Sequence, residues 1–149
     1  LLQVDVPYPE AELERKILIE TTGLADQQPQ AVLNPDALIR LQRLVRAMPV
    51  GEKVLASILE LVRSARPGSS TDPRVNQHVA WGPGPRAGQA LMLAVRARAL
   101  LRGRLAPAVD DVAALARPAL VHRMQLSFGA RAEGLDIDSL VDDLAERAA

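Results

Sequence analysis

The chain has 149 residues, enough for one domain of ordinary size, and 48% of them are hydrophobic while only 2% are aromatic. The apolar content is therefore mostly leucine, alanine and valine, which favours an all-α domain. The 18 basic and 18 acidic residues cancel, which disfavours a general nucleic-acid binder, and the lack of cysteine excludes disulfide scaffolds, cysteine zinc sites and thiol catalysis.

The N-terminal residues have the period of a half-buried strand. Leu2, Val4 and Val6 alternate with polar residues, and Pro7 ends the run. A single strand needs partners, so we expect it to belong to a sheet outside this chain. The sequence has no initiator methionine, no signal peptide and no apolar run near the roughly 18 residues of a membrane span. We interpret it as a piece of a longer, cytoplasmic protein.

A first helix is predicted from Pro9 to Gly23, because proline suits the first helical position and glycine suits a helix end. Glutamates in its first half favour the positive end of the helix dipole. Leu13, Ile17 and Leu24 are predicted to form its buried stripe.

The middle of the chain predicts two amphipathic helices. The run Asn34-Pro35-Asp36 places an N-cap, a proline and an acid in the order of a helix start, and Pro49 ends that helix. The second helix covers residues 52–65, up to a break rich in proline and glycine. The positions predicted to face a core are Leu38, Leu41, Val45 and Met48 in the first helix and Val54, Leu55, Ile58, Leu61, Val62 and Ala65 in the second.

The C-terminal half predicts further helices. A long helix is expected over residues 85–102, and another start lies at Pro107, in a stretch that Pro118 is expected to divide into two short helices. Phe128-Gly129 opens a loop, and a last amphipathic helix spans residues 137–147. The predicted fold is thus an all-α helical bundle with one short orphan strand at the N-terminus.

Catalytic motifs are absent from the sequence. It has no Gly-x-x-x-x-Gly-Lys-[Ser/Thr] phosphate loop and no acidic cluster after an apolar strand. His78 and His122 are 44 positions apart and belong to no zinc-binding pair, so no metal site is predicted. We therefore expect this chain alone to bind no cofactor and to catalyse no reaction.

One loop has a composition that suggests a binding role. The run Gly82-Pro83-Gly84-Pro85-Arg86 restricts the backbone and delivers one arginine to the first turn of the long helix. A guanidinium binds phosphate oxygens in a fork geometry, and a helix N-terminus favours anions. A surface arginine after a tight turn is the alternative interpretation.

This loop resembles the Gly-[Ala/Pro]-Ser-x-Arg-Ala sensor-2 motif of MoxR-family AAA+ ATPases. Gly84 departs from the pattern, where serine is common, and Ala106 stands where a serine or threonine N-cap is common. The resemblance continues in family order over nearly the whole chain. Residues 1–9 are similar to the last core strand and the hinge into the helical lid, and residues 72–75 are similar to the approach to sensor 2. Residues 99–104 are similar to the end of the sensor-2 helix, and residues 110–116 and 120–123 are similar to the closing lid helices.

The resemblance implies that residues 1–7 are the last strand of an AAA+ core with its hinge, and that residues 8–149 are a helical lid carrying sensor 2. It implies that Arg86 is catalytic and binds the γ-phosphate of ATP held by its own or a neighbouring subunit. Tyr8 lies at the implied hinge, where it either borders the adenine of ATP or anchors the core to the lid. His122-Arg123 also matches the family, although a histidine in this setting is more often a packing residue than a ligand.

The intact protein implied by the resemblance is an ATPase that uses ATP and Mg²⁺ and acts as a chaperone. Its implied partners are its own AAA+ core, further copies in a hexameric ring, and proteins with a von Willebrand factor A domain that it remodels or activates. The alternative is a freestanding helical module that binds protein or nucleic acid with no link to an ATPase.

The charged residues are unevenly distributed. Residues 86–104 contain five arginines and no acid, and residues 133–146 contain six acids and no base. These runs are interpreted either as two solvated faces or as docking surfaces of opposite charge, between subunits or onto a partner.

Overall fold

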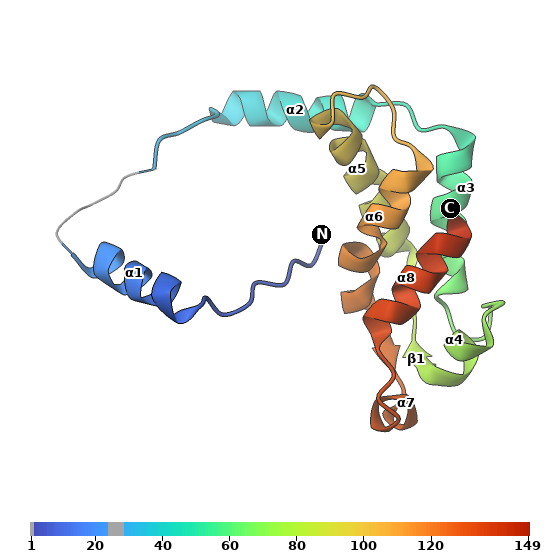
Figure 1. Cartoon of the computed structure of the whole chain (residues 1–149). Coiled ribbons are helices and arrows are strands. Elements are labelled where there is room, and N and C mark those ends of the chain that lie inside the picture. The colour runs from blue at the N-terminus through green and yellow to red at the C-terminus, as the bar shows by residue number, and fades with distance from the viewer. Residues whose placement is uncertain (1, 24–28) are drawn as a thin grey trace.

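The computed structural model describes residues 2–23 and 29–149, and helices dominate it. The helices α3 (Glu52–Ser64), α5 (Pro85–Leu101), α6 (Val109–Leu120) and α8 (Ile137–Ala148) pack around one hydrophobic core. Figure 1 shows this bundle together with an arm that holds α1 (Ala11–Thr22) away from it. The all-α prediction is confirmed.

The stripe that α5 contributes to the core has a spacing of four residues. Ala87, Leu91, Val95 and Ala99 are all 0% exposed. Residues four apart lie on one face of a helix, and the two alanines allow neighbouring helices to approach closely. The predicted apolar face of α3 is likewise buried, apart from the half-buried Leu55.

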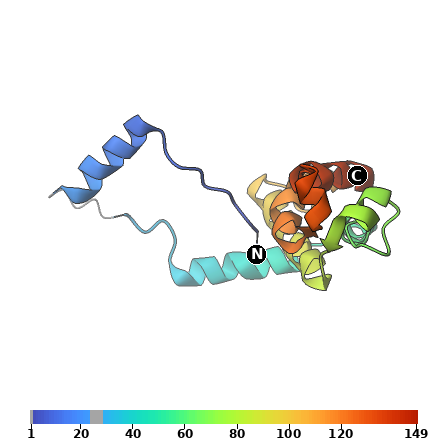
Figure 2. The same ribbon diagram turned by 90° about the horizontal axis from the view of Figure 1, so that it is seen from below.

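The arm consists of the N-terminal segment, α1 and α2 (Pro35–Ala47), and it projects from one side of the bundle (Figure 2). Neither α1 nor α2 contains a buried residue. The predicted stripe of α1 is therefore wrong for this chain, since Leu13 and Ile17 are exposed, and Leu24 lies outside the described residues.

The predicted stripe of α2 is buried only at its end. Leu38 and Leu41 are exposed, Val45 is half-buried, and Met48, just past the helix, is buried. Both helices have an amphipathic pattern, but the described residues provide no partner that covers most of their apolar faces.

The predicted N-terminal strand is not formed, because residues 2–10 have no regular secondary structure. Val4 and Val6 are exposed, and the segment contacts the bundle through a hydrogen bond of 2.8 Å from the backbone N–H of Gln3 to the carbonyl of Pro118. A strand needs a row of such hydrogen bonds to a neighbouring strand, and among the described residues this segment has no neighbouring strand.

Several short elements were not predicted from the sequence. Strand β1 (Val79–Trp81) pairs antiparallel with β2 (Gln125–Leu126), with Val79 opposite Leu126 and Trp81 opposite Gln125. The helices α4 (Pro73–His78) and α7 (Phe128–Ala132) were not predicted either, and the sequence predicted only a loop at Phe128-Gly129. Where a second short helix was expected after Pro118, the structure has the 3₁₀ turn η1 (Val121–Arg123). The β1–β2 pair brings together segments that are more than 40 residues apart.

Two predictions about α6 were wrong. Pro118 does not divide the helix, which continues through it to Leu120. A proline this close to the end removes only a hydrogen bond of the last turn. The helix begins at Val109 with Ala108 as its N-cap, so Ala106 does not occupy the capping position. The backbone N–H of Ala108 is satisfied instead by the carboxylate of Asp111, at 2.8 Å.

Buried carboxylates hold the helices together. Asp72, 2% exposed, accepts hydrogen bonds of 2.8 Å from the guanidinium groups of Arg74 and Arg147, and so links α4 to α8. Asp111, 0% exposed, accepts from Arg98 of α5 and, at 2.7 Å, from Arg104. The two like-charged runs are therefore partly neutralised within the chain. Asp142 and Asp143 of the acidic run also pair, with Arg117 and Arg74 respectively.

Candidate functional site

A cavity of about 560 Å³ opens where the loop before α5 meets η1 and β2. This volume lies within the range of small-molecule pockets, about 300–1,000 Å³. Its lining residues are Trp81, Gly82, Gly84, Pro85, Arg86, Ala87, His122, Arg123, Met124 and Gln125. The β1–β2 pair joins the two walls, because Trp81 of one wall lies opposite Gln125 of the other.

The first wall is fixed by contacts of its backbone. Arg66, just after α3, donates a hydrogen bond of 2.8 Å from Nε to the carbonyl of Pro83, whose side chain is fully buried. A Cβ on Gly82 would lie 2.6 Å from the carbonyl oxygen of Ala65, so only glycine fits this close approach. The expectation that this loop restricts its backbone is supported by these contacts.

Arg86 is the second residue of α5, and its side chain is exposed at the mouth of the cavity. The first turn of α5 contains no acidic residue, although a helix N-terminus favours negative charge. Within the part of the chain that the structure describes, Arg86 makes no ion pair or side-chain hydrogen bond, in contrast to the arginines that hold Asp72 and Asp111. An arginine so placed remains available to an anion.

The second wall carries His122 and Arg123. The Arg123 guanidinium donates to the carbonyl of Ala119 one turn earlier. Partial burial, together with the nearby charge of Arg123, lowers the pKa of His122 from its ordinary value of 6.5. The sequence singled out both residues, but it favoured a packing role for His122. The structure instead places His122 on the surface of the cavity, with an exposed side chain.

The described residues that line the cavity include two types able to bind an anion, arginine and histidine, and no aspartate or glutamate. A pocket with this charge selects a negatively charged ligand such as a phosphate chain. Among the described residues, no group of three or more histidines, cysteines or acids is arranged to hold a metal ion.

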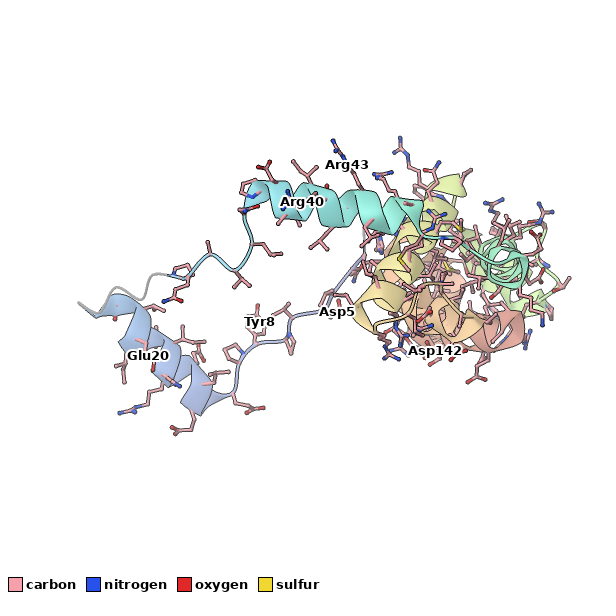
Figure 3. All side chains as sticks on the ribbon, turned by 90° about the horizontal axis from the view of Figure 1, so that it is seen from above. Asp5, Tyr8, Glu20, Arg40, Arg43 and Asp142 are labelled. Carbon is pink, nitrogen blue, oxygen red and sulfur yellow. The ribbon has the colours of Figure 1, made fainter. Side chains whose placement is uncertain are left out.

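Tyr8 is not part of this cavity. Its side chain is 99% exposed, and Figure 3 shows it on the N-terminal segment, between α1 and the bundle. Its assignment to an adenine site therefore stays a prediction. Trp81, which lines the cavity and is 68% exposed, was not identified as a site residue from the sequence. Strands of two and three residues leave no recognisable period, so nothing in the sequence indicated that Trp81 lines the same cavity as His122.

Comparison with known proteins identifies the bundle. Residues 71–144, which contain both walls of the cavity, match the model of the AAA lid domain family. The chain contains an AAA lid domain. The predicted relationship to the lids of MoxR-type AAA+ ATPases is confirmed, and it favours the lid over a freestanding binding module.

Two curated relatives match most or all of the chain. Chaperone MoxR1 of Mycobacterium tuberculosis is 28% identical over 150 residues, which span 100% of this chain and 40% of the relative. Uncharacterized protein YeaC of Bacillus subtilis is 30% identical over 155 residues, which span 93% of this chain and 46% of the relative. The chain thus spans less than half the length of the curated relatives it matches.

The crystal structure of a candidate ATPase from Cytophaga hutchinsonii has the same fold, with a TM-score of 0.86 and 20% sequence identity. The match covers 99% of this chain and 45% of that one, so it includes the arm as well as the bundle. Among the described residues, no helix is both long and apolar enough to cross a membrane.

Proposed function

We propose that this chain is the lid of an ATPase, in which the cavity faces bound ATP and Arg86 is the sensor-2 arginine that binds the γ-phosphate. The observation that carries the proposal is an exposed arginine at the N-terminus of α5 that has no ion-pair partner among the described residues, in a cavity that no described carboxylate lines. Such a group stabilises the charge that develops during phosphoryl transfer. The ATP and Mg²⁺ would be held mainly by the AAA+ core, which precedes the lid in this proposal.

The arm supports the proposed division between core and lid, with residues 1–7 as the end of the core and residues 8–149 as the lid. Large apolar side chains are exposed along both of its helices: Leu13, Ile17, Leu18 and Ile19 in α1, and Leu38, Ile39, Leu41 and Leu44 in α2. Apolar surface on this scale is rarely left in contact with water. In the proposed ATPase these faces pack against the AAA+ core of the same or a neighbouring subunit.

The intact protein is proposed to form a ring and to couple ATP hydrolysis to remodelling of partner proteins. The Mycobacterium tuberculosis relative is named as a chaperone, which supports this activity. A protein with a von Willebrand factor A domain is the partner class that the MoxR resemblance implies.

The test is substitution of Arg86 in the intact ATPase that contains this chain. Arg86→Ala removes a charge-assisted contact to a phosphate in the transition state, which is worth about 2–4 kcal/mol, so kcat should fall about 30- to 1,000-fold. Arg86→Lys keeps the charge but loses the fork geometry and should recover only part of the rate. Because Arg86 is exposed, the melting temperature should barely change.

Arg102 provides a matched control. It is an exposed arginine at the C-terminal end of α5, about 24 Å from Arg86 at 1.5 Å per residue. Arg102→Ala should hydrolyse ATP at the wild-type rate. A wild-type rate for Arg86→Ala would refute the sensor-2 assignment, and a loss of rate that only follows loss of folding would make Arg86 structural.

A further inference from the structure

We propose that His122 is a second phosphate-binding residue of this cavity, acting from the wall opposite Arg86 on the same polyphosphate chain. The inference rests on the proposed function, because it assigns a further residue to the site that Arg86 defines. It adds a ligand contact from η1, an element that the sensor-2 motif does not include.

The placement of His122 is the first argument. It lies on η1, three residues before Gln125, which pairs with Trp81 in the β1–β2 ladder. Arg86 lies five residues beyond Trp81, at the start of α5. The ladder therefore joins the two walls, and His122 and Arg86 both line the cavity.

The second argument is that the side chains of Arg86 and His122 are both available to a ligand. Within residues 2–23 and 29–149, the side chains of Arg86 and His122 take part in no ion pair or side-chain hydrogen bond. Arg123, by contrast, already donates to the carbonyl of Ala119. Among the described residues that line the cavity there is no carboxylate to pair with this exposed imidazole, so the ring is available to an incoming ligand.

The third argument is chemical. Since the pKa of His122 is lowered, the ring is largely neutral at neutral pH and has one N–H to donate. A phosphate oxygen accepts such a hydrogen bond, and its negative charge also favours the protonated ring, which donates from both nitrogens. His122 thus strengthens binding of a polyphosphate, yet it does not add a permanent positive charge to those of Arg86 and Arg123 when no ligand is bound.

The chain carries its own reporter for the experiment. Trp81 is its single tryptophan, and it lines the same cavity. The 149-residue chain is titrated with inorganic tripolyphosphate at constant ionic strength, and Trp81 fluorescence is recorded. We expect a saturable change, an affinity about tenfold weaker for His122→Ala, and partial recovery in His122→Gln, which keeps a donor at the same place. Arg86→Ala should weaken binding at least as much.

His78 is the matched control, because it is the other histidine of the chain and does not line this cavity. His78→Gln should bind tripolyphosphate as wild type does. The melting temperature of His122→Ala should equal that of wild type, since the side chain is exposed. A parallel titration with ATP shows whether a nucleotide or a free polyphosphate is the better ligand.

The outcomes separate the two proposals. Wild-type affinity in His122→Ala, or no saturable response of the unsubstituted chain up to about 10 mM, overturns the role of His122. Neither result refutes the sensor-2 role of Arg86, which is decided by hydrolysis in the intact ATPase. If His122→Ala and His78→Gln weaken binding equally, the effect is not specific to the cavity, and the inference also fails.

Discussion

Replacement of Asp111 by asparagine should destabilise the bundle in a strongly pH-dependent way. Burial alone would raise the pKa of Asp111, but hydrogen bonds from Arg104, the backbone of Ala108 and Arg98 outweigh it and lower this pKa from 3.8 to about 2. At about 1.4 kcal/mol for each pKa unit, the difference corresponds to about 2–3 kcal/mol of unfolding free energy at pH 7. Asp111→Asn should lose about this amount.

The sign of the pH dependence follows from the direction of the change. Because the folded-state pKa of Asp111 lies below its unfolded value, the stabilisation is complete above about pH 5 and is lost as the pH falls toward 2. The difference in unfolding free energy between wild type and Asp111→Asn should therefore shrink to about half its neutral value by pH 3. Asp72, whose pKa is also lowered to about 2, chiefly by its hydrogen bond from Arg74, titrates equally in both proteins.

The measurement is urea unfolding followed by circular dichroism at pH 7, 4 and 3, with linear extrapolation to water. Asp110→Asn is the control, because Asp110 is exposed in the same helical turn. This substitution should lower the unfolding free energy by less than about 1 kcal/mol. A wild-type-to-variant difference that stays constant from pH 7 to pH 3 would refute the assigned role of the Asp111 carboxylate. So would equal losses in the two variants.

Three further changes have outcomes that the structure determines. Gly82→Ala should lower the unfolding free energy by about 1–3 kcal/mol and weaken tripolyphosphate binding, because its Cβ would lie 2.6 Å from the backbone carbonyl oxygen of Ala65. Gly129→Ala, whose Cβ would meet nothing within 4 Å, is the control in thermal melting. Ala108→Ser should raise the unfolding free energy by about 1 kcal/mol by capping α6, whereas Ala106→Ser should not, and equal melting temperatures would contradict this. Leu41→Glu should leave the melting of this chain within about 0.5 kcal/mol of wild type but reduce hydrolysis by the intact ATPase, and a large destabilisation of the chain would show that α2 is already packed.

Helix positions were predictable because they depend on local signals. The expected start at residues 34–36 and the long helix from Pro85 agree with α2 and α5 to within a residue. The apolar faces of α1 and α2 were also visible in the sequence, but a pattern does not indicate what covers it. In this chain those faces are exposed, and the described residues offer no surface that covers them.

The site was only half predictable. Arg86 was found because glycine and proline in its loop indicate a fixed backbone, and this feature is local. Trp81 and His122 become neighbours through a ladder of two short strands, which leaves no periodic signal. Asp110 and Asp111 are adjacent and chemically identical in the sequence, yet one is exposed and the other is held by two arginines. Which of them is buried depends on how α6 rotates against α5, and that is a property of the packed bundle.

The ion pairs of the bundle also set the geometry of the cavity. Arg86 is carried by α5, and His122 follows directly from α6. Asp111 joins these two helices through Arg98, and the cavity end of the bundle is tied together by the hydrogen bond from Arg66 to Pro83 and by the β1–β2 pair. With both ends of the α5–α6 pair fixed, one wall cannot move relative to the other without breaking a buried contact. In the function proposed above, a phosphate bound between the walls would therefore shift the bundle as one body rather than a single loop.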